Sequence, residues 1–326
     1  MAVPAPPIRS PLTISLALQG GGAHGAFTWG VLDRLLDEPS ITFDGVSATS
    51  SGAMNALALA QGWLDGGRTG ARTALANLWE RVAAQANLMR WAFASPAGAA
   101  TETVLLNLTR HFAPQEINPL GLNPLREIAS ALFDFERLRA AAPFKLFLAA
   151  TRVRDGALTL FANEQLSIDA LLASACLPQV FAPVHIDGEM YWDGGYAGNP
   201  ALEPLMYDCR SADIVCVLVQ PLEQAQPPQS AREIRDRVSE LGFSTTFLRE
   251  LEMVRRAQSS LTGALPLSWI GRRVKALRIE IIEPGESLDS YSAKTRLNTR
   301  IAFLRELCDI GRACAQRWLE TRGADR

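Results

Sequence analysis

The stretch Ile41-Thr-Phe-Asp-Gly-Val-Ser-Ala-Thr-Ser50-Ser-Gly-Ala-Met-Asn55 predicts a buried strand that turns sharply into a helix rich in alanine and leucine. A serine lies at the turn. This order is typical of a nucleophile elbow, in which a strained corner exposes a serine hydroxyl and the helix N-terminus supplies positive potential. Alternatively, the serine only caps the N-terminus of the helix. The other motifs of the chain are needed to choose between these two interpretations.

Three serines, Ser47, Ser50 and Ser51, compete for the tip of this turn. Ser50 has Ala48 two residues before it and Gly52 two residues after it, and both are small enough for a close approach of the backbone. Either alternative would put a β-branched threonine at one of the two positions, where its side chain is stiff and bulky. The spacing therefore favours Ser50.

A second motif follows the apolar strand pattern of residues 12–19. It is Gly20-Gly-Gly-Ala-His-Gly25, and a helical pattern over 26–36 comes next. Successive glycine N–H groups before a helix converge well on a negatively charged oxygen. The same letters match a dinucleotide-binding loop, but that loop requires an acidic residue at the end of the second strand. Here the second strand ends at the candidate nucleophile instead, which favours an oxyanion loop.

A third motif, Met190-Tyr-Trp-Asp-Gly-Gly195, places Asp193 at the end of a predicted strand with two glycines behind it. Alone, an Asp-Gly-Gly sequence is usually a turn. In a chain that also carries a serine elbow, Asp193 becomes a candidate base.

Composition restricts the class of protein. The 326 residues are 48% hydrophobic, enough for a large core, and the formal net charge of −2 gives no electrostatic footprint for nucleic acid. The five cysteines are scattered and lack Cys-x-x-Cys spacing, which predicts reduced thiols and no zinc site. The N-terminus lacks the pattern of a signal peptide, and no apolar run reaches roughly 18 residues. We therefore expect a cytoplasmic protein, with membrane contact limited to a peripheral one.

Together with Ala173-Ser-Ala-Cys-Leu-Pro178 and Pro183-Val-His-Ile-Asp-Gly188, the three motifs resemble the patatin-like phospholipase family in identity, order and spacing. The resemblance covers about residues 12–208, and the remainder resembles an extension found in one bacterial branch. It implies an α/β fold, a three-layer α/β/α sandwich, with a mainly helical C-terminal extension. The expected organisation is a flexible arm over 1–11, a catalytic domain over 12–208 and an extension over 209–326 that packs on the same core.

The resemblance also implies roles for individual residues. Ser50 would be the nucleophile of a Ser-Asp dyad and Asp193 its base, without a metal or other cofactor. The oxyanion hole would consist of the backbone amides of Gly20, Gly21 and Gly22. Supporting positions of the three motifs are His24, Gly25, Ala48, Gly52, Gly194 and Gly195.

Two of these positions depart from the family pattern. Ala48 stands where the elbow usually begins with glycine, and its methyl group could tilt the turn. His24 stands where the glycine loop usually carries Arg or Lys, so any charge assistance from it would depend on pH.

The predicted chemistry is acyl transfer from a lipid ester to water through an acyl-enzyme, as in a phospholipase A or a lipid esterase. His111 and His185 lie in segments that favour structural roles, so Asp193 would take the serine proton directly. An aspartate with a pKa of about 3.9 is a weak base, and burial would have to raise that pKa. Transfer to an alcohol acceptor, a binding scaffold without turnover and a nucleotide-binding protein remain alternatives.

Two helical patterns have open interpretations. The apolar pattern over 73–112, broken at Ser95-Pro-Ala-Gly98, favours core helices over a mobile flap above a lipid cleft. The pattern over 231–256 favours packing on its own domain over a role at a membrane surface. Its apolar positions are Ile234, Val238, Leu241, Phe247, Leu251 and Val254.

Overall fold

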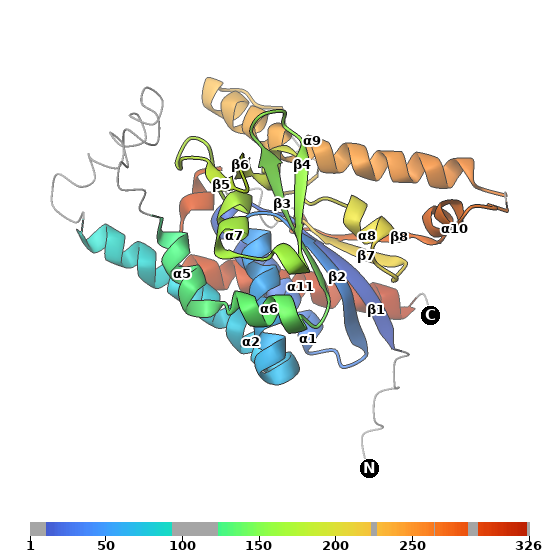
Figure 1. Cartoon of the computed structure of the whole chain (residues 1–326), viewed down its shortest axis with the longest axis horizontal. Helices are drawn as coiled ribbons and strands as arrows, with labels where there is room; N and C mark the ends of the chain where they lie inside the picture. The colour runs from blue at the N-terminus through green and yellow to red at the C-terminus, as the bar shows by residue number, and fades with distance from the viewer. Residues whose placement is uncertain (1–10, 93–122, 223–226, 264, 286–292, 325–326) are drawn as a thin grey trace, which may run out of the picture.

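The computed structural model describes residues 11–92, 123–222, 227–263, 265–285 and 293–324. These residues form one mixed sheet between two layers of helices (Figure 1). The order of the strands is β5-β6-β3-β2-β1-β7-β8, and β4 pairs with β3. The strands are β1 (Leu12–Leu18), β2 (Ile41–Ala48), β3 (Lys145–Arg152), β4 (Leu158–Ala162), β5 (Val184–Ile186), β6 (Glu189–Asp193), β7 (Asp213–Val217) and β8 (Arg278–Ile282).

The two helical layers cover opposite faces of the sheet. Figure 1 shows α1, α2 and α11 together on one side and α9 on the other. The helices are α1 (Gly25–Leu36), α2 (Ser51–Ala92), α5 (Pro124–Leu132), α6 (Phe135–Ala141), α7 (Ile168–Ser174), α8 (Glu203–Tyr207), α9 (Ala231–Ser260), α10 (Trp269–Ala276) and α11 (Ile301–Ala324). Short 3-10 turns are η1 (Gly22–His24), η2 (Asn163–Gln165), η3 (Gly194–Tyr196) and η5 (Ala293–Leu297). The expected α/β/α sandwich is therefore confirmed.

Strands β1 and β2 at the centre of the sheet end level with each other, and the parallel strand β3 continues past them to Arg152. Leu18 at the end of β1 pairs with Ala48 at the end of β2, and Ala48 pairs with Leu148 of β3. Because the carboxyl ends of parallel strands meet at one edge, the loops after β1 and β2 emerge side by side. The topology thus brings the glycine loop to the serine elbow.

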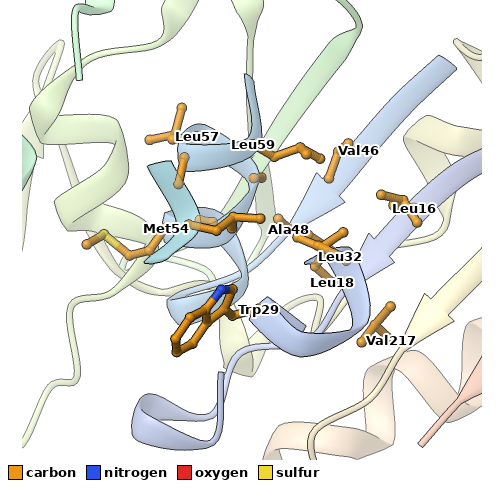
Figure 2. Close-up of a cluster of buried hydrophobic side chains, with 14 of the residues drawn as sticks. Leu16, Leu18, Trp29, Leu32, Val46, Ala48, Met54, Leu57, Leu59 and Val217 are labelled. Atoms are coloured by element: carbon orange, nitrogen blue, oxygen red, sulfur yellow. The ribbon is translucent and has the colours of Figure 1, made fainter. Parts of the chain in front are cut away.

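Alternation of side chains along β1 divides the core between the two faces. Leu16 and Leu18 point into the larger cluster with helices α1 and α2, where Figure 2 shows them beside Leu32 and Val46. Ala17 points the other way, into a second cluster with α8 and α9. Strands β7 and β8 extend the sheet beyond β1, so residues after 208 contribute to both the sheet and its helical layers. The domain division at residue 208 remains a prediction.

Helix α9 follows the predicted packing along only part of its length. Phe247, Leu251 and Val254 are buried in the second cluster, as the interpretation of packing on its own domain requires. Ile234 and Val238, nearer the N-terminus, are 49% and 64% exposed, and Leu241 is also exposed. The expected packing of the helix on its own domain was therefore right for the C-terminal half of α9 and wrong for its N-terminal half.

Other helical expectations have mixed outcomes. The pattern that starts at residue 73 belongs to α2, which ends at Ala92, and the segment with the break at 95–98 lies outside the described residues. The pattern over residues 295–322 predicts one long terminal helix. In the structure the 3-10 turn η5 ends at Leu297, and α11 begins at Ile301. Within the described ranges, no helix combines the length and apolar character that crossing a bilayer requires.

Candidate active site

The backbone of Ser50 is left-handed, with φ of +54°. It lies between the end of β2 and the first residue of α2, and its N–H donates to Ser174 Oγ at 3.0 Å. Left-handed conformations are uncommon for residues with a side chain and concentrate at functional sites. A Cβ added at Gly52 would lie 2.4 Å from the carbonyl oxygen of Leu18, so the helix can approach β1 only with glycine there.

The other two serines of the elbow have different surroundings. Ser51 Oγ accepts a hydrogen bond from the Gly21 N–H at 3.0 Å, which ties the elbow to the glycine loop. Ser47 lies within β2 and is fully buried. Of the three candidates, Ser50 is the one at the strained corner, in agreement with the preference from spacing.

The methyl group of Ala48 lies in the hydrophobic core. Ala48 is the last residue of β2 and is fully buried, and Figure 2 shows it in the cluster that contains Leu18, Leu32 and Met54. Ala48 is paired with Leu18 of β1 on one side and with Leu148 of β3 on the other. The departure from glycine at this position is thus accommodated by packing, and the strand retains its pairing up to the turn.

Asp193 is the last residue of β6 and is 1% exposed. Strand β6 runs antiparallel to β3, with Asp193 opposite Ala150, and β3 in turn lies beside β2. The sheet therefore carries the aspartate to the same edge as the elbow. The Asp193 Oδ1 atom accepts from the Gly195 N–H at 2.7 Å, and its own N–H donates to the Cys176 carbonyl at 2.7 Å.

Burial raises the pKa of Asp193 to about 7. Hydrogen bonding from the Gly195 N–H and from the Ser50 hydroxyl opposes this shift, because both stabilise the carboxylate. The Oδ2 atom is buried and has no hydrogen-bond partner within the described ranges, although the Ser50 hydroxyl is close enough to the carboxylate to lower its pKa. Such geometry is common for catalytic pairs before substrate binds.

The amides of the glycine loop differ in their hydrogen bonds. The Gly20 N–H donates to the Asn199 carboxamide oxygen at 2.7 Å, in a buried position, and the Gly21 N–H donates to Ser51 Oγ. The Gly22 N–H donates to no residue of the described chain. In this state, two of the three amides predicted for the oxyanion hole are occupied within the protein. The assignment of Gly20, Gly21 and Gly22 remains a prediction, and among the three only the Gly22 N–H is left without an acceptor in the described residues.

Asn199 is a site residue that the sequence analysis missed. Besides accepting from Gly20, its carboxamide nitrogen donates to the carbonyl of Phe243 on α9 at 3.1 Å. A second hydrogen bond to this loop is donated by Thr49 Oγ1 to the Gly198 carbonyl at 2.7 Å. The loop after Asp193 is thereby joined to both the glycine loop and the elbow. Asn-Pro marks a turn in the sequence, but nothing local shows that the asparagine is buried.

His24 is buried, and its Nε2 atom lies 2.8 Å from Thr295 Oγ1. Burial, assisted by the nearby charge of Arg296, lowers its pKa to about 4. The imidazole is therefore neutral at neutral pH, and any charge assistance from it would be confined to acidic pH. The backbone of Arg296 also lies against the loop, since a Cβ at Gly22 would be 2.5 Å from its carbonyl oxygen.

The remaining predicted site residues have the following surroundings. His185 is exposed on β5, and His111 lies outside the described residues. Gly25, Gly194 and Gly195 are points of close approach to Ser51, Ala149 and Phe243, in that order. The described residues contain no group of three His, Cys, Asp or Glu side chains suited to a metal ion.

The fold and this site define a class of α/β protein in which two parallel strands lead to a glycine loop and to a serine on a left-handed corner, and an antiparallel strand brings a buried aspartate to the same sheet edge. Comparison with known families gives the same result. Residues 16–206 match the model of the patatin-like phospholipase family, and the chain belongs to that family.

Two individual proteins are also similar to this chain. The uncharacterized protein YjjU of Escherichia coli (strain K12) is 24% identical over 327 residues, covering 96% of this chain and 79% of that protein. The crystal structure of VipD from Legionella pneumophila aligns with a TM-score of 0.37 and 15% identity, covering 92% of this chain and 67% of that one.

Proposed function

We propose that this protein is a lipid acyl hydrolase that uses Ser50 as the nucleophile and Asp193 as the base. Membership of the patatin-like phospholipase family implies hydrolysis of lipid acyl esters. The observation that carries the proposal is the left-handed Ser50 at the N-terminus of α2, whose hydroxyl interacts with the buried carboxylate of Asp193. That pairing is what a two-residue acyl-transfer site needs.

The environment of Asp193 makes direct proton transfer feasible. With a pKa of about 7, the carboxylate is ionised in a large fraction of molecules near neutral pH and is a far stronger base than an exposed aspartate. The Gly195 N–H holds Oδ1 at 2.7 Å, which leaves Oδ2 to receive the serine proton.

The acyl-transfer cycle follows from these positions. Asp193 takes the Ser50 hydroxyl proton as Oγ attacks the ester carbonyl carbon, and the carbonyl π electrons move onto its oxygen. The Gly22 N–H and the N-terminus of α2 stabilise that oxyanion, with Gly21 joining if its bond to Ser51 is released. The C–O bond then breaks, and the alcohol leaves with the proton from Asp193. Water repeats the sequence on the acyl-enzyme and releases the fatty acid.

Treatment with a serine-reactive fluorophosphonate tests the nucleophile directly. Intact mass should show one adduct on the wild type and none on Ser50→Ala, while Ser51→Ala serves as the matched control and should still be labelled. Release of fatty acid from a phospholipid and of the phenol from a short-chain aryl ester should parallel the labelling. An adduct that persists in Ser50→Ala would contradict the assignment of the nucleophile.

The alternatives give different results in the same experiment. A scaffold that binds acyl lipids would give neither adduct nor turnover. Transfer to an alcohol acceptor would give the adduct, with acylated glycerol in place of free fatty acid when glycerol is added.

A further inference from the structure

The N-terminal half of α9 carries an apolar stripe that faces away from the protein. Ile234, Val238 and Leu241 follow one another at spacings of four and three residues and therefore share one face of the helix. They are 49%, 64% and 41% exposed. We refer to these three residues as the α9 stripe. An apolar face of this kind on a surface helix requires an explanation, because isolated exposed apolar residues are common but an ordered row is not.

The opposite face of the same helix is occupied by the protein itself. Phe243 lies against Gly195 and Tyr196, with 4.7 Å between the ring centroids of the two aromatic residues. Glu240 forms an ion pair with Arg296 at 3.1 Å. Since these inward contacts fix the rotation of the helix, the α9 stripe must point outward.

These inward contacts also place the α9 stripe beside the candidate active site. Gly195, which Phe243 contacts, holds the carboxylate of Asp193, and Arg296 lies against the glycine loop at Gly22. Leu297, next to Arg296, is 69% exposed and adds a further apolar side chain near this end of the site.

Arginines lie beside the α9 stripe on the outward face of the helix. Arg235 and Arg249 are exposed and share the outward face. From residue 234 to residue 249 the positions of that face are 234, 235, 238, 241, 242, 245 and 249, and they include these two arginines and no acidic residue. The next acidic residue on the face, Glu252, is paired with Arg256 at 2.7 Å. The carboxylates Glu240 and Glu250 are instead directed inward, where Glu250 accepts from the Leu202 N–H at 2.8 Å. Apolar side chains flanked by cations suit the boundary of an anionic lipid layer.

We infer that the N-terminal half of α9 docks on an anionic lipid surface through Ile234, Val238 and Leu241, and so positions the active site at the layer that supplies its substrate. This inference rests on the proposed function, since a lipid acyl hydrolase must take its ester from a lipid layer. The apolar stripe enters the boundary between head groups and acyl chains, and Arg235 and Arg249 contact the anionic head groups.

Binding to vesicles tests the inference without any turnover. The Ser50→Ala protein is mixed with vesicles of phosphatidylglycerol and phosphatidylcholine in equal amounts, or of phosphatidylcholine alone, and its partition is measured by sedimentation. We expect stronger partition to the anionic vesicles. In the same background, the triple change Ile234→Ser, Val238→Ser and Leu241→Ser should weaken partition about tenfold or more.

A matched control removes apolar side chains elsewhere. Leu265 and Leu267 are 90% and 92% exposed, in the segment before α10, and Arg273 of that helix donates to the backbone of Met206 and Ser211. Ser211 bonds to Thr13 at the start of β1, so this region lies at the sheet edge opposite the elbow. The double change Leu265→Ser and Leu267→Ser should leave partition unchanged. An equal loss in this control would overturn the inference.

Turnover separates this inference from the proposed function. With Ser50 intact, the triple variant should hydrolyse a water-soluble aryl ester at the wild-type rate and vesicle phospholipid about tenfold more slowly. If the wild-type protein does not hydrolyse the aryl ester at all, the proposed function is contradicted, whereas the vesicle-binding result is unaffected. Wild-type partition to neither kind of vesicle, or a dimer in solution that the triple change dissociates, would refute lipid docking and assign the α9 stripe to another occupant.

Discussion

The N–H of Gly20 donates a 2.7 Å hydrogen bond to the carboxamide oxygen of Asn199, a fully buried side chain in the loop after Asp193. The same carboxamide lies 3.4 Å from the Gly20 carbonyl oxygen, as its donor, so the two residues are joined in both directions. The glycine loop and the acid loop are therefore one hydrogen-bonded unit. The geometry between the glycine loop and Asp193 therefore depends on a residue that belongs to none of the three sequence motifs.

Replacing Asn199 by alanine should weaken both folding and catalysis. The change leaves the buried Gly20 N–H without its acceptor, which costs about 1 to 3 kcal/mol of the free energy of unfolding. We expect the kcat for an aryl ester to fall about tenfold or more as the glycine loop shifts. Urea unfolding and steady-state kinetics measure the two effects. Thr49→Val, which removes only the bond to Gly198, is the control and should affect kcat less; unchanged turnover in Asn199→Ala would contradict the prediction.

The pH dependence of turnover should report Asp193. Its carboxylate must be ionised to accept the serine proton, and its pKa is raised to about 7 by burial. We therefore expect kcat/KM to rise with pH, with a midpoint near that value, and to level off above it. His24 should not contribute to this limb, because its pKa is lowered to about 4. A flat profile between about pH 5 and pH 8 would exclude Asp193 as the base.

Asp193→Asn should stabilise the protein at high pH. The folded pKa of about 7 exceeds the unfolded value of about 3.9, so the folded protein binds the proton more tightly within that window. The stability that the protonated carboxyl contributes is complete below the unfolded pKa and is lost as the pH rises through the folded pKa. Asparagine cannot ionise, and the gain should reach on the order of 4 kcal/mol above pH 8. Urea unfolding at several pH values measures it; a gain that does not grow with pH would refute the raised pKa.

Gly195→Ala should interfere with the packing of α9. A Cβ at this position would lie 2.1 Å from the ring of Phe243, so the ring or the turn must move. We expect a loss of about 2 kcal/mol in the free energy of unfolding and a reduced kcat, because the Gly195 N–H also holds Asp193. In a Phe243→Ala background the same change should cost much less. A double-mutant cycle measures this coupling, and strictly additive effects would argue against the contact.

A permanent positive charge at position 24 should lower the free energy of unfolding. His24 is buried beside Arg296, whose charge helps to lower its pKa, and His24→Arg would put two like charges there. We expect about 2 to 4 kcal/mol of destabilisation. His24→Gln keeps a neutral side chain that can bond to Thr295, so it should be much milder. Thermal or urea unfolding compares the two variants, and equal stability would contradict the role of Arg296.

Local sequence was sufficient to predict the strands and to predict that Ser50 is the serine at the turn. The apolar pattern of a strand is visible in the strand's own residues. The requirement for small residues around Ser50 is likewise visible in its sequence neighbours, because only small residues fit at the close-approach positions. The order and spacing of the three motifs also identified the family, which the match over residues 16–206 confirms.

Tertiary structure decided which groups of the site remain available for chemistry. The hydrogen bonds of Gly20 and Gly21 end on Asn199 and Ser51, and the pKa of Asp193 depends on burial by several elements. It also decided that α9 buries Phe247 and exposes Val238, although both fit one amphipathic pattern. Burial and hydrogen-bond partners come from residues far away in the chain. A sequence pattern shows which side chains can be buried, and only the packed structure shows which of them are.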